Sequence, residues 1–321
     1  MVTFLLLFTA AVVVYFHYKR DAKQSGVQVA YVLADSTKVL DTPAEVHTVI
    51  TTLKNDTQVE VLDRTAHWVK VKLDDGRIGW IEAKDLLEGE DFEAGQRLLR
   101  ELASLPVQAM GHTDGIVNLR LEPSRDAGQL AQLEQNRKVE VFGRRLVARP
   151  SNSDQPASPA VKEAWYLVRT QTRAGWLLGR FVELDVPPSL SPFASGTNMV
   201  AWITLDTVDD AGRQVPQYLT AERMGTQDVD FNHIRVFTWW IKDQRYVTAY
   251  VESGLNGYFP IRVMHSGRVP IFRLRLVNDE GNKIQKVYGL FDTITRPLGT
   301  VAGWESDAMP APPEHRHRRR R

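Results

Sequence analysis

Hydrophobic and polar residues alternate in several stretches of this chain, and the clearest of them runs from Trp68 to Trp80. Its sequence is WVKVKLDDGRIGW, in which two alternating segments flank Asp74, Asp75 and Gly76. Alternation with a period of two is typical of a half-buried strand, and an Asp-Gly pair between two such segments is typical of a tight turn. The stretch therefore predicts a β-hairpin with a tryptophan at each end.

The same pattern returns later in the chain, which indicates an internal repeat. The segment QVEVLDR at 58–64 matches KVEVFGR at 138–144, and WVKVKLDDGRIGW matches WYLVRTQTRAGW at 165–176. The register breaks between these matches, where residues 148–164 are rich in Pro, Ser and Ala and have no apolar period. Such an insertion predicts a surface loop, and several short strands in each copy predict two small barrels.

Both copies resemble bacterial Src-homology-3-like (SH3-like) domains. The second copy carries the Asn-x-Arg segment and proline turn of that family as VNLRLEPS, with Asn118 and Arg120, and both copies have a Gly-Trp pair near their end. The first copy departs from the pattern, because Lys38 and Leu40 stand where Asn118 and Arg120 would be. The resemblance covers less than half of the chain. It implies work at the bacterial cell envelope, on peptidoglycan or on an envelope protein.

The segment between the copies has a helical pattern. One face of a helix at 91–105 would carry most of the apolar residues, and Pro106 follows it. These apolar residues are Phe92, Leu98, Leu99, Leu102 and Leu105. We expect this helix to pack the two barrels together, and binding of a partner is the alternative.

The last third of the chain has a new series of strand patterns after Pro187. The segment IRVFTWWIK, which starts at Ile234, is apolar on both faces, which is typical of a strand covered on both sides. The segment PIFRLRLV alternates, with Arg273 and Arg275 on one face, and predicts a strand with one solvent face. Hairpin turns are expected at 243–245 and 278–281. A third, β-rich domain follows from these patterns.

We therefore predict an all-β chain in which two small SH3-like barrels, joined by a helix, are followed by a separate antiparallel β domain, with an N-terminal transmembrane helix. The predicted parts are a transmembrane anchor at 1–20, a linker at 21–34, the first barrel at 35–88, the connecting helix at 89–106, the second barrel at 107–186 with its loop insertion at 148–164, the β-rich domain at 187–305 and a disordered basic tail at 306–321.

The N-terminal prediction rests on the uncharged run from Phe4 to Phe16, which extends to Tyr18 if the intervening histidine is neutral. Eighteen residues make roughly 27 Å of helix, close to the hydrocarbon thickness of a membrane. Lys19 and Arg20 follow the span, and the positive-inside rule would place the body of the chain in the cytoplasm. The domain type favours the opposite side. We predict a single-pass membrane protein whose body is extracytoplasmic, with the orientation left open.

Charge and composition narrow the classes of function. The 321 residues include 40 Lys and Arg against 39 Asp and Glu, for a net charge of +1, so no global field recruits nucleic acid. Arginines gather at the C-terminus in HRHRRRR, which could contact an anionic surface. The chain has no cysteine, which excludes disulfides, thiolate metal sites and cysteine nucleophiles.

Candidate chemistry is sparse. The segment DVDFNH holds Asp228, Asp230 and His233, which could suit a hard metal, but a turn explains the same residues. We predict no catalytic residue, no metal and no cofactor. Phosphate loops and nucleophile elbows are absent from the sequence. A glycosidase needs only two carboxylates, which the sequence readily supplies.

The candidate ligand-binding residues are aromatic and polar side chains of the three β regions. Trp68 and Trp165 open a strand in each copy. Packing in the core is the default for each of them, and partial exposure, which would let them stack on sugar rings or apolar peptide side chains, is the functional alternative. Trp80 and Trp176 are expected to pack inside the barrels. The full set of candidates is Trp68, Asp75, Asn118, Arg120, Trp165 and Trp239.

The leading interpretation is a membrane-anchored, non-enzymatic binding or scaffold protein of the bacterial cell envelope. Its tandem modules would bind peptidoglycan or an envelope protein, with no small-molecule substrate, and duplication would raise avidity. One alternative is a cytoplasm-facing adaptor or regulator with a basic tail. Another is a hydrolase that uses carboxylates of the C-terminal domain.

Overall fold

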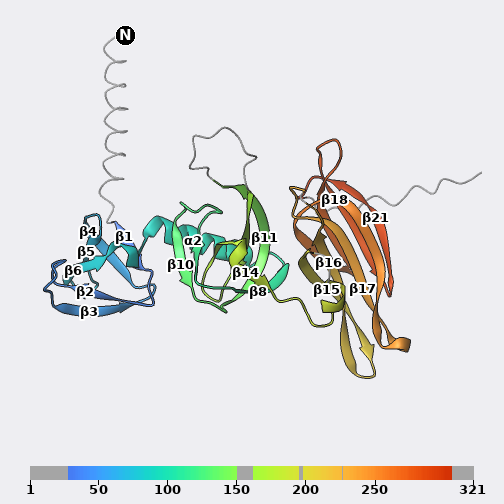
Figure 1. Cartoon of the computed structure of the whole chain (residues 1–321), viewed down its shortest axis with the longest axis horizontal. Helices are drawn as coiled ribbons and strands as arrows, with labels where there is room; N and C mark the ends of the chain where they lie inside the picture. Colours follow the sequence, from blue (N-terminus) through green and yellow to red (C-terminus); the bar gives the residue numbers. More distant parts are fainter. Residues whose placement is uncertain (1–27, 150–161, 195–197, 226, 306–321) are drawn as a thin grey trace, which may run out of the picture. The chain divides into compact units, whose positions relative to one another are not determined.

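The computed structural model describes residues 28–149, 162–194, 198–225 and 227–305 (Figure 1). The predicted membrane anchor at 1–20, the basic tail at 306–321 and the first part of the linker lie outside the described residues. Within the described part, no helix is long and apolar enough to cross a membrane. The chain divides into two units, one up to Glu93 and one from Ala94 onward, and each is described by itself.

The first unit contains an antiparallel sheet in the strand order β3-β2-β6-β5-β4-β1-β7. Its elements are β1 (Val29–Val32), β2 (Ser36–Leu40), β3 (Val49–Lys54), β4 (Gln58–Arg64), β5 (Trp68–Lys72), β6 (Ile78–Glu82), the 3-10 turn η1 (Ala83–Asp85) and β7 (Leu86–Glu88). The predicted hairpin is β5 with β6, and Gly76 adopts a φ of 85° at its turn, which favours glycine. Val39, Val69 and Ile81 belong to its core.

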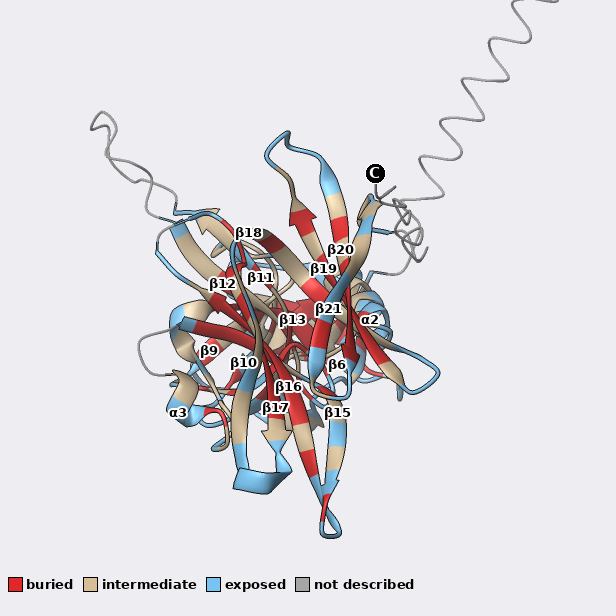
Figure 2. Cartoon of the chain, turned by 90° about the vertical axis from the view of Figure 1, so that its right-hand side faces the viewer, coloured by how far each residue is buried: buried red, intermediate tan, exposed pale blue. Residues whose placement is uncertain are grey.

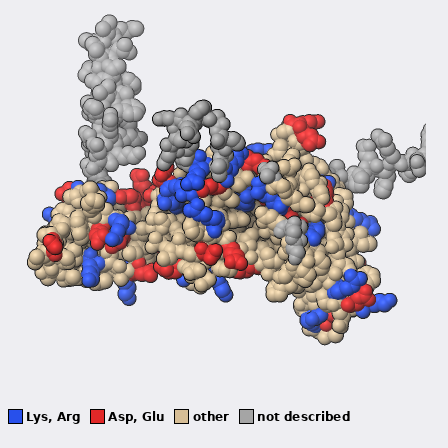
Figure 3. Space-filling model, viewed as in Figure 1, with Lys and Arg blue, Asp and Glu red and all other residues tan. Residues whose placement is uncertain are grey.

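The second unit begins with a sheet that repeats this order, as β10-β9-β13-β12-β11-β8-β14. Its elements are β8 (Ala109–Thr113), β9 (Val117–Arg120), β10 (Gln129–Leu133), β11 (Lys138–Ala148), β12 (Lys162–Arg169), β13 (Ala174–Leu178), the 3-10 turn η2 (Gly179–Phe181) and β14 (Val182–Leu184). Lys and Arg side chains gather over this part of the chain in Figure 3, and Arg125 and Arg180 both approach Glu163, at 2.7 and 3.9 Å.

The predicted loop insertion is shorter than expected at both ends. Ala148 still belongs to β11 and pairs with Lys162, so β12 starts inside the segment that we assigned to the loop. A ladder of backbone hydrogen bonds holds both strands there, although the sequence of this segment has no apolar alternation. Residues 150–161 lie outside the described part.

The helix between the two copies is α2 (Gly89–Leu102), which ends earlier than the predicted Leu105. In the first unit, the ring of Phe92 stacks on Tyr31 with a centroid distance of 3.7 Å. In the second unit, Leu102 is 1% exposed and packs in a cluster with Phe142 and Ala174. Leu98, Leu99 and Leu105 are partly buried against this cluster, so the apolar stripe packs on the second unit as an amphipathic helix does.

A close approach of strands explains the Gly-Trp pair of each copy. A Cβ on Gly79 of β6 would lie 2.5 Å from Val39 Cγ1 on β2. A Cβ on Gly175 of β13 would lie 2.7 Å from the carbonyl oxygen of Arg120 on β9. Distances below 3.0 Å leave no room for a side chain. Glycine is therefore the residue that lets these strands meet in both sheets.

The third sheet follows in the same unit and has its strands in sequence order, from β15 to β21. Its elements are α3 (Ser191–Ala194), β15 (Asn198–Asp210), β16 (Arg213–Arg223), β17 (Phe231–Trp240), the 3-10 turn η3 (Ile241–Asp243), β18 (Arg245–Ser266), β19 (Val269–Val277), β20 (Lys283–Phe291) and β21 (Ile294–Ala302). The first part of β18 pairs with β17 and its last part pairs with β19. One core cluster joins residues of β15 to β20, and Figure 2 shows buried segments along β16 and β17.

Two predictions for this sheet need correction. Ile234, Val236 and Phe237 are fully buried, as expected, but Trp240 at the strand end is 44% exposed. Arg273, which we placed on a solvent face, is 1% exposed. Alternation in β19 does not mark a solvent face here, because successive residues from Pro270 to Leu274, which point to both faces of the strand, are all buried.

A buried glutamine joins the second and third sheets. Gln108, which is 0% exposed, donates through Nε2 to the carbonyl oxygen of Ile261 at 3.1 Å and accepts through Oε1 from the Ile261 N–H at 2.8 Å. Its own carbonyl oxygen accepts from the Trp202 N–H at 2.9 Å. The side-chain N–H and C=O of Gln108 therefore both form hydrogen bonds between the second and third sheets.

Candidate functional site

A cavity of about 440 Å³ lies in the third sheet and includes the predicted ligand residue Trp239. Its walls come from β15, β16 and β17 and from the turns that link β18 to β19 and β20 to β21. The chain therefore brings together segments that are up to 87 positions apart, from Asp206 to Thr293.

Neighbouring side chains fix the indole of Trp239. Its Nε1 donates to Asp210 Oδ2 at 3.0 Å, and its ring meets Tyr246 edge to face with a centroid distance of 5.1 Å. The guanidinium of Arg213 lies 5.1 Å from the ring centroid. An aromatic ring held in this way is a preorganised surface for a ligand.

Polar groups line the same cavity. Asp206 is half-buried on β15, and Asp292 is exposed in the turn after β20, where its φ is 55°. Gln217 is 3% exposed, and its Oε1 has no hydrogen-bond partner among the described residues. A buried acceptor without a partner costs about 1–3 kcal/mol. A ligand that brings a hydroxyl group could satisfy Gln217.

This combination suits a sugar ring. Apolar faces of sugars pack on indole rings, and their hydroxyl groups use carboxylate and amide oxygens. Two carboxylates in one cavity, Asp206 and Asp292, are also the groups that glycoside hydrolysis needs. Sequence reasoning named Trp239 but missed these aspartates, because they lie in separate segments with no shared motif.

The candidates of the first unit lie at its hairpin. Trp68 is partly exposed at the start of β5, which agrees with the functional alternative and not with the core default. Asp75 is exposed in the turn and forms an ion pair with Arg77 at 2.7 Å. Hydrogen bonds from Arg77 hold the pKa of Asp75 below its usual value. This ion pair belongs to the turn itself, because Arg77 also donates to the carbonyl oxygen of Ile50.

The candidates of the second sheet have local partners. Asn118 Oδ1 accepts from Gln132 Nε2 at 3.2 Å, and Arg120 Nη1 donates to the carbonyl oxygen of Ala127 at 2.7 Å. Trp165 is 3% exposed and packs beside Trp176, which agrees with the core default and not with the partly exposed alternative. Alternation fixes which residues share a face of β12 but not which face is inward.

The six candidates are not brought to one site. Trp68 and Asp75 lie in the first unit, whereas Asn118, Arg120 and Trp165 belong to the second sheet. Trp239 lies in the third sheet. The structure thus associates one of the six with a cavity.

The DVDFNH segment has separate partners for its side chains. Asp228 forms an ion pair with Lys162, and His233 Nδ1 lies 2.7 Å from Ser253 Oγ. Asp230 is 9% exposed and accepts from the Phe259 N–H at 3.0 Å. Burial raises the pKa of Asp230 to about 6. In the described part of the chain, no group of three His, Asp or Glu side chains is placed to hold a metal ion.

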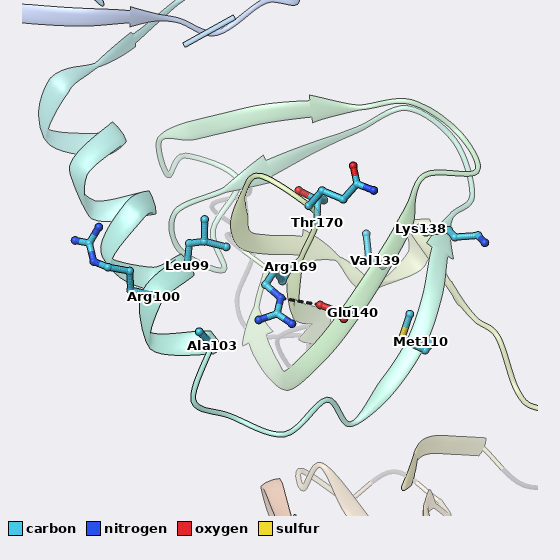
Figure 4. Close-up of a pocket in the computed structure, with 10 residues that line it drawn as sticks. Leu99, Arg100, Ala103, Met110, Lys138, Val139, Glu140, Arg169 and Thr170 are labelled. Atoms are coloured by element: carbon cyan, nitrogen blue, oxygen red, sulfur yellow. Dashed lines mark hydrogen bonds and ion pairs between the residues drawn. The ribbon is translucent and has the colours of Figure 1, made fainter. Parts of the chain in front are cut away.

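A second cavity, of about 610 Å³, lies between the end of α2 and the strands β8, β11 and β12 (Figure 4). Its lining includes Leu99, Met110 and Val139, and an ion pair joins Arg169 Nε to Glu140 Oε2 at 2.6 Å. Sequence reasoning did not find this cavity. The apolar stripe of α2 was the available signal, which we interpreted as packing, with binding of a partner as the alternative.

Comparison with known proteins identifies one domain. Residues 35–87 match the family model of the bacterial SH3 domain, so the chain contains a bacterial SH3-like domain there, as the sequence predicted. A search of the curated proteins finds no match to the chain.

Solved structures that align with this chain include three of similar type. NlpC2 from Trichomonas vaginalis is 11% identical over 73% of this chain and 98% of that chain, with a TM-score of 0.18. An NlpC/P60 family protein from Bacillus cereus ATCC 10987 is 10% identical over 70% and 94%, with a TM-score of 0.21. NlpC1 from Trichomonas vaginalis is 10% identical over 71% and 92%, with a TM-score of 0.18.

These neighbours correct the functional prediction. These neighbours are NlpC or NlpC/P60 family proteins, and they contradict the prediction of a non-enzymatic scaffold and of a chain that is no enzyme. At these TM-scores the likeness carries no argument about the chemistry of this chain. That chemistry has to follow from its own residues.

Proposed function

We propose that this chain is a carboxylate-dependent hydrolase whose substrate is the glycan strand of peptidoglycan. The observation that supports this most directly is the cavity of the third sheet, where Trp239 lines the same space as Asp206 and Asp292. The bacterial SH3-like domain at 35–87 supports a cell-wall substrate, by the resemblance described above. Cysteine nucleophiles are excluded because the chain contains no cysteine, and Asp206 and Asp292 are the acid–base groups that this cavity offers for glycoside hydrolysis.

In the proposed reaction, a sugar ring packs against Trp239 and offers a hydroxyl group to Gln217. One aspartate, as the acid, gives its proton to the glycosidic oxygen while the C–O bond breaks. The other aspartate takes a proton from the attacking water, whose hydroxyl joins the anomeric carbon. The products are two shorter glycans, and the two carboxyl groups exchange protons with water before the next turnover.

We also infer that the second sheet is a second SH3-like module. It has the strand order of the first sheet, and Gly175 repeats the close strand approach of Gly79. Two weak modules on one chain raise the effective concentration of a polymer near the catalytic cavity. A cell-wall substrate places the working part of the chain outside the cytoplasm in this proposal.

The test is the release of soluble reducing ends from purified sacculi by the full chain. We expect Asp206→Asn and Asp292→Asn each to lower the rate about 100-fold or more, in the range for loss of a general acid or base. Asp279→Asn is the matched control, because Asp279 is exposed in the turn after β19 and does not line the cavity.

The outcomes separate catalysis from binding. Full release by both cavity variants, or no release by the unmodified chain, would show that the proposed hydrolase is wrong. Sedimentation of the same variants with sacculi measures binding separately from catalysis. A loss of release with unchanged sedimentation supports the catalytic role of the aspartates.

A further inference from the structure

The cavity between α2 and the second sheet has an apolar interior that no proposed activity uses. Leu99 and Ala103 reach it from the end of α2, and Met110 and Val139 reach it from β8 and β11 (Figure 4). Its volume of about 610 Å³ is within the usual range of ligand sites. Met110 is 41% exposed, so a hydrophobic side chain faces solvent at a place where a ligand could cover it.

One arginine inside this cavity is held on two sides. Arg169 Nε donates to Glu140 Oε2 at 2.6 Å, and the guanidinium lies 4.9 Å from the ring centroid of Phe142. Its side chain is 26% exposed. Among the described residues, Arg169 makes no further side-chain hydrogen bond, so its two terminal nitrogens have their N–H groups available.

We propose that this cavity binds the C-terminal end of a peptide. The α-carboxylate accepts hydrogen bonds from both terminal nitrogens of Arg169, and the last side chain, which is apolar, packs on Leu99, Met110 and Val139. The Nε of this guanidinium is already bonded to Glu140, so its two terminal nitrogens can bind a second carboxylate. Two parallel hydrogen bonds of this kind give strong, oriented binding. Glu140 and Phe142 fix that fork before the ligand arrives, which lowers the entropy lost on binding.

The rim of the cavity favours an anionic ligand. Arg100 and Lys138 flank the opening, with their charged ends directed outward in Figure 4. Neither has a carboxylate within 4.0 Å among the residues that the structure describes. Glu140 is the acidic residue of the lining, and Arg169 already neutralises it. The positive charge therefore attracts a carboxylate.

A peptide fits better than a fatty acid, which is the other common apolar carboxylate. Thr170 and Gln171 line one side of the cavity, and Gln171 is exposed. The Thr170 hydroxyl already bonds to the backbone of Arg173, so Gln171 is the residue whose side-chain amide can bond to the amide groups of a peptide. A hydrocarbon chain offers Gln171 no such bond. This inference is independent of the proposed hydrolase activity.

The experiment measures fluorescence anisotropy of a labelled Gly-Ser-Gly-Ala-Leu peptide with the full chain. The free acid should bind about tenfold or more tightly than the same peptide with a C-terminal amide. Arg169→Lys keeps the charge but removes the fork, and should lower the affinity for the acid about tenfold. Met110→Glu places a negative charge at an exposed position of the lining and should weaken binding to a similar extent.

The matched control is Arg145→Lys. Arg145 lies 4.9 Å from the ring centroid of Trp176 in the same sheet, as Arg169 does from Phe142, but it does not line the cavity. Equal binding of acid and amide, or an equal loss in Arg145→Lys, would overturn the proposal. Binding of octanoate without binding of the peptide acid would overturn the peptide as the occupant. Unchanged melting temperatures confirm that each variant is folded.

Discussion

At the scale of single residues, Asp230 is a carboxyl group at a buried position, where its charged form is disfavoured. Asp230 is 9% exposed, and its carboxylate accepts one backbone hydrogen bond, from Phe259. Burial raises the pKa of Asp230 to about 6, and the Asp228 carboxylate acts in the same direction. The hydrogen bond from Phe259 and the charges of Arg144 and Arg145 act to lower this pKa, but burial outweighs them. The folded chain therefore holds a proton on Asp230 at pH values where the unfolded chain has released it.

The first prediction follows from this shift. The unfolded pKa is about 3.8 and the folded pKa about 6, so the stability associated with Asp230 is fully present below pH 3.8 and is lost as pH rises through 6. The loss amounts to about 3 kcal/mol at most. We expect Asp230→Asn to stabilise the chain at pH 8 by about 1–3 kcal/mol and to leave it nearly unchanged at about pH 4.

Urea unfolding at a series of pH values measures this effect. Asp243→Asn, at an exposed carboxylate, should show no comparable gain at about pH 8. A gain for Asp230→Asn that is the same in acid and in mild base would contradict the titration as its cause.

The second prediction concerns the tryptophan of the third-sheet cavity. Trp239 lines the cavity, whereas its neighbour Trp240 is 44% exposed and does not. We expect Trp239→Ala to weaken binding of soluble glycan fragments about tenfold, or about 1.4 kcal/mol, because the apolar surface that the sugar buries on the indole is lost. Titration calorimetry compares it with Trp240→Ala, and equal losses would show that the cavity is not the glycan site.

At the scale of strands and helices, glycine decides where two strands can meet. A methyl group added at Gly175 of β13 would lie within 3.0 Å of the Arg120 carbonyl oxygen and the Leu119 side chain. A methyl group at Gly143 of β11 would make only ordinary contacts, the shortest being 3.7 Å to Leu167 Cβ. Of these two glycines in one sheet, only Gly175 lies where an added methyl group would clash with its neighbours.

The third prediction uses this pair. Gly175→Ala should destabilise the second unit by about 1–3 kcal/mol, because backbone cannot yield to the added methyl group. In a domain of this size that corresponds to roughly 2–4 °C of melting temperature for each kcal/mol. Gly143→Ala should change the melting temperature little. Equal effects in the two variants would contradict the close approach as the reason for glycine.

The sequence predicted those elements whose signals are local. The Asp-Gly turn located the β5–β6 hairpin, and the apolar stripe located α2. The prediction from sequence failed where the burial of a residue depends on other segments that pack against the face of the sheet. Arg273 alternates with apolar residues just as a solvent-facing residue would, yet it is buried in the fold. The cavity around Trp239 was beyond prediction because Asp292 joins it from a turn far along the chain.

At the scale of the whole second unit, Gln108 couples two sheets that the chain builds separately. Its amide bonds to both backbone groups of Ile261, and Nε2 also donates to the carbonyl oxygen of Pro106 at 2.8 Å. Beside it, Arg144 of the second sheet donates to the carbonyl oxygen of Val229, before the third sheet's β17. The two sheets therefore share buried polar contacts rather than an apolar seam alone.

The fourth prediction tests that coupling. Gln108→Leu fills a similar volume but leaves the N–H and C=O of Ile261 buried without partners, at a cost of about 1–3 kcal/mol for each group. Because these bonds join sheets with separate cores, their loss should uncouple the sheets rather than unfold one of them. Calorimetry should then resolve two melting transitions in the second unit where the unmodified chain shows one.

Gln132→Leu is the control, since Gln132 is exposed on β10 and, among the described residues, its side chain bonds to Asn118 of the same sheet and to no residue of the third sheet. It should leave the single transition in place. If Gln108→Leu melts in one transition at an unchanged temperature, the glutamine does not couple the sheets.

Loss of the coupling would also let the third-sheet cavity move independently of the second sheet. The same variant should then lower glycan release from sacculi while binding to soluble fragments stays unchanged, because polymer held by the second sheet no longer reaches the cavity in a fixed geometry.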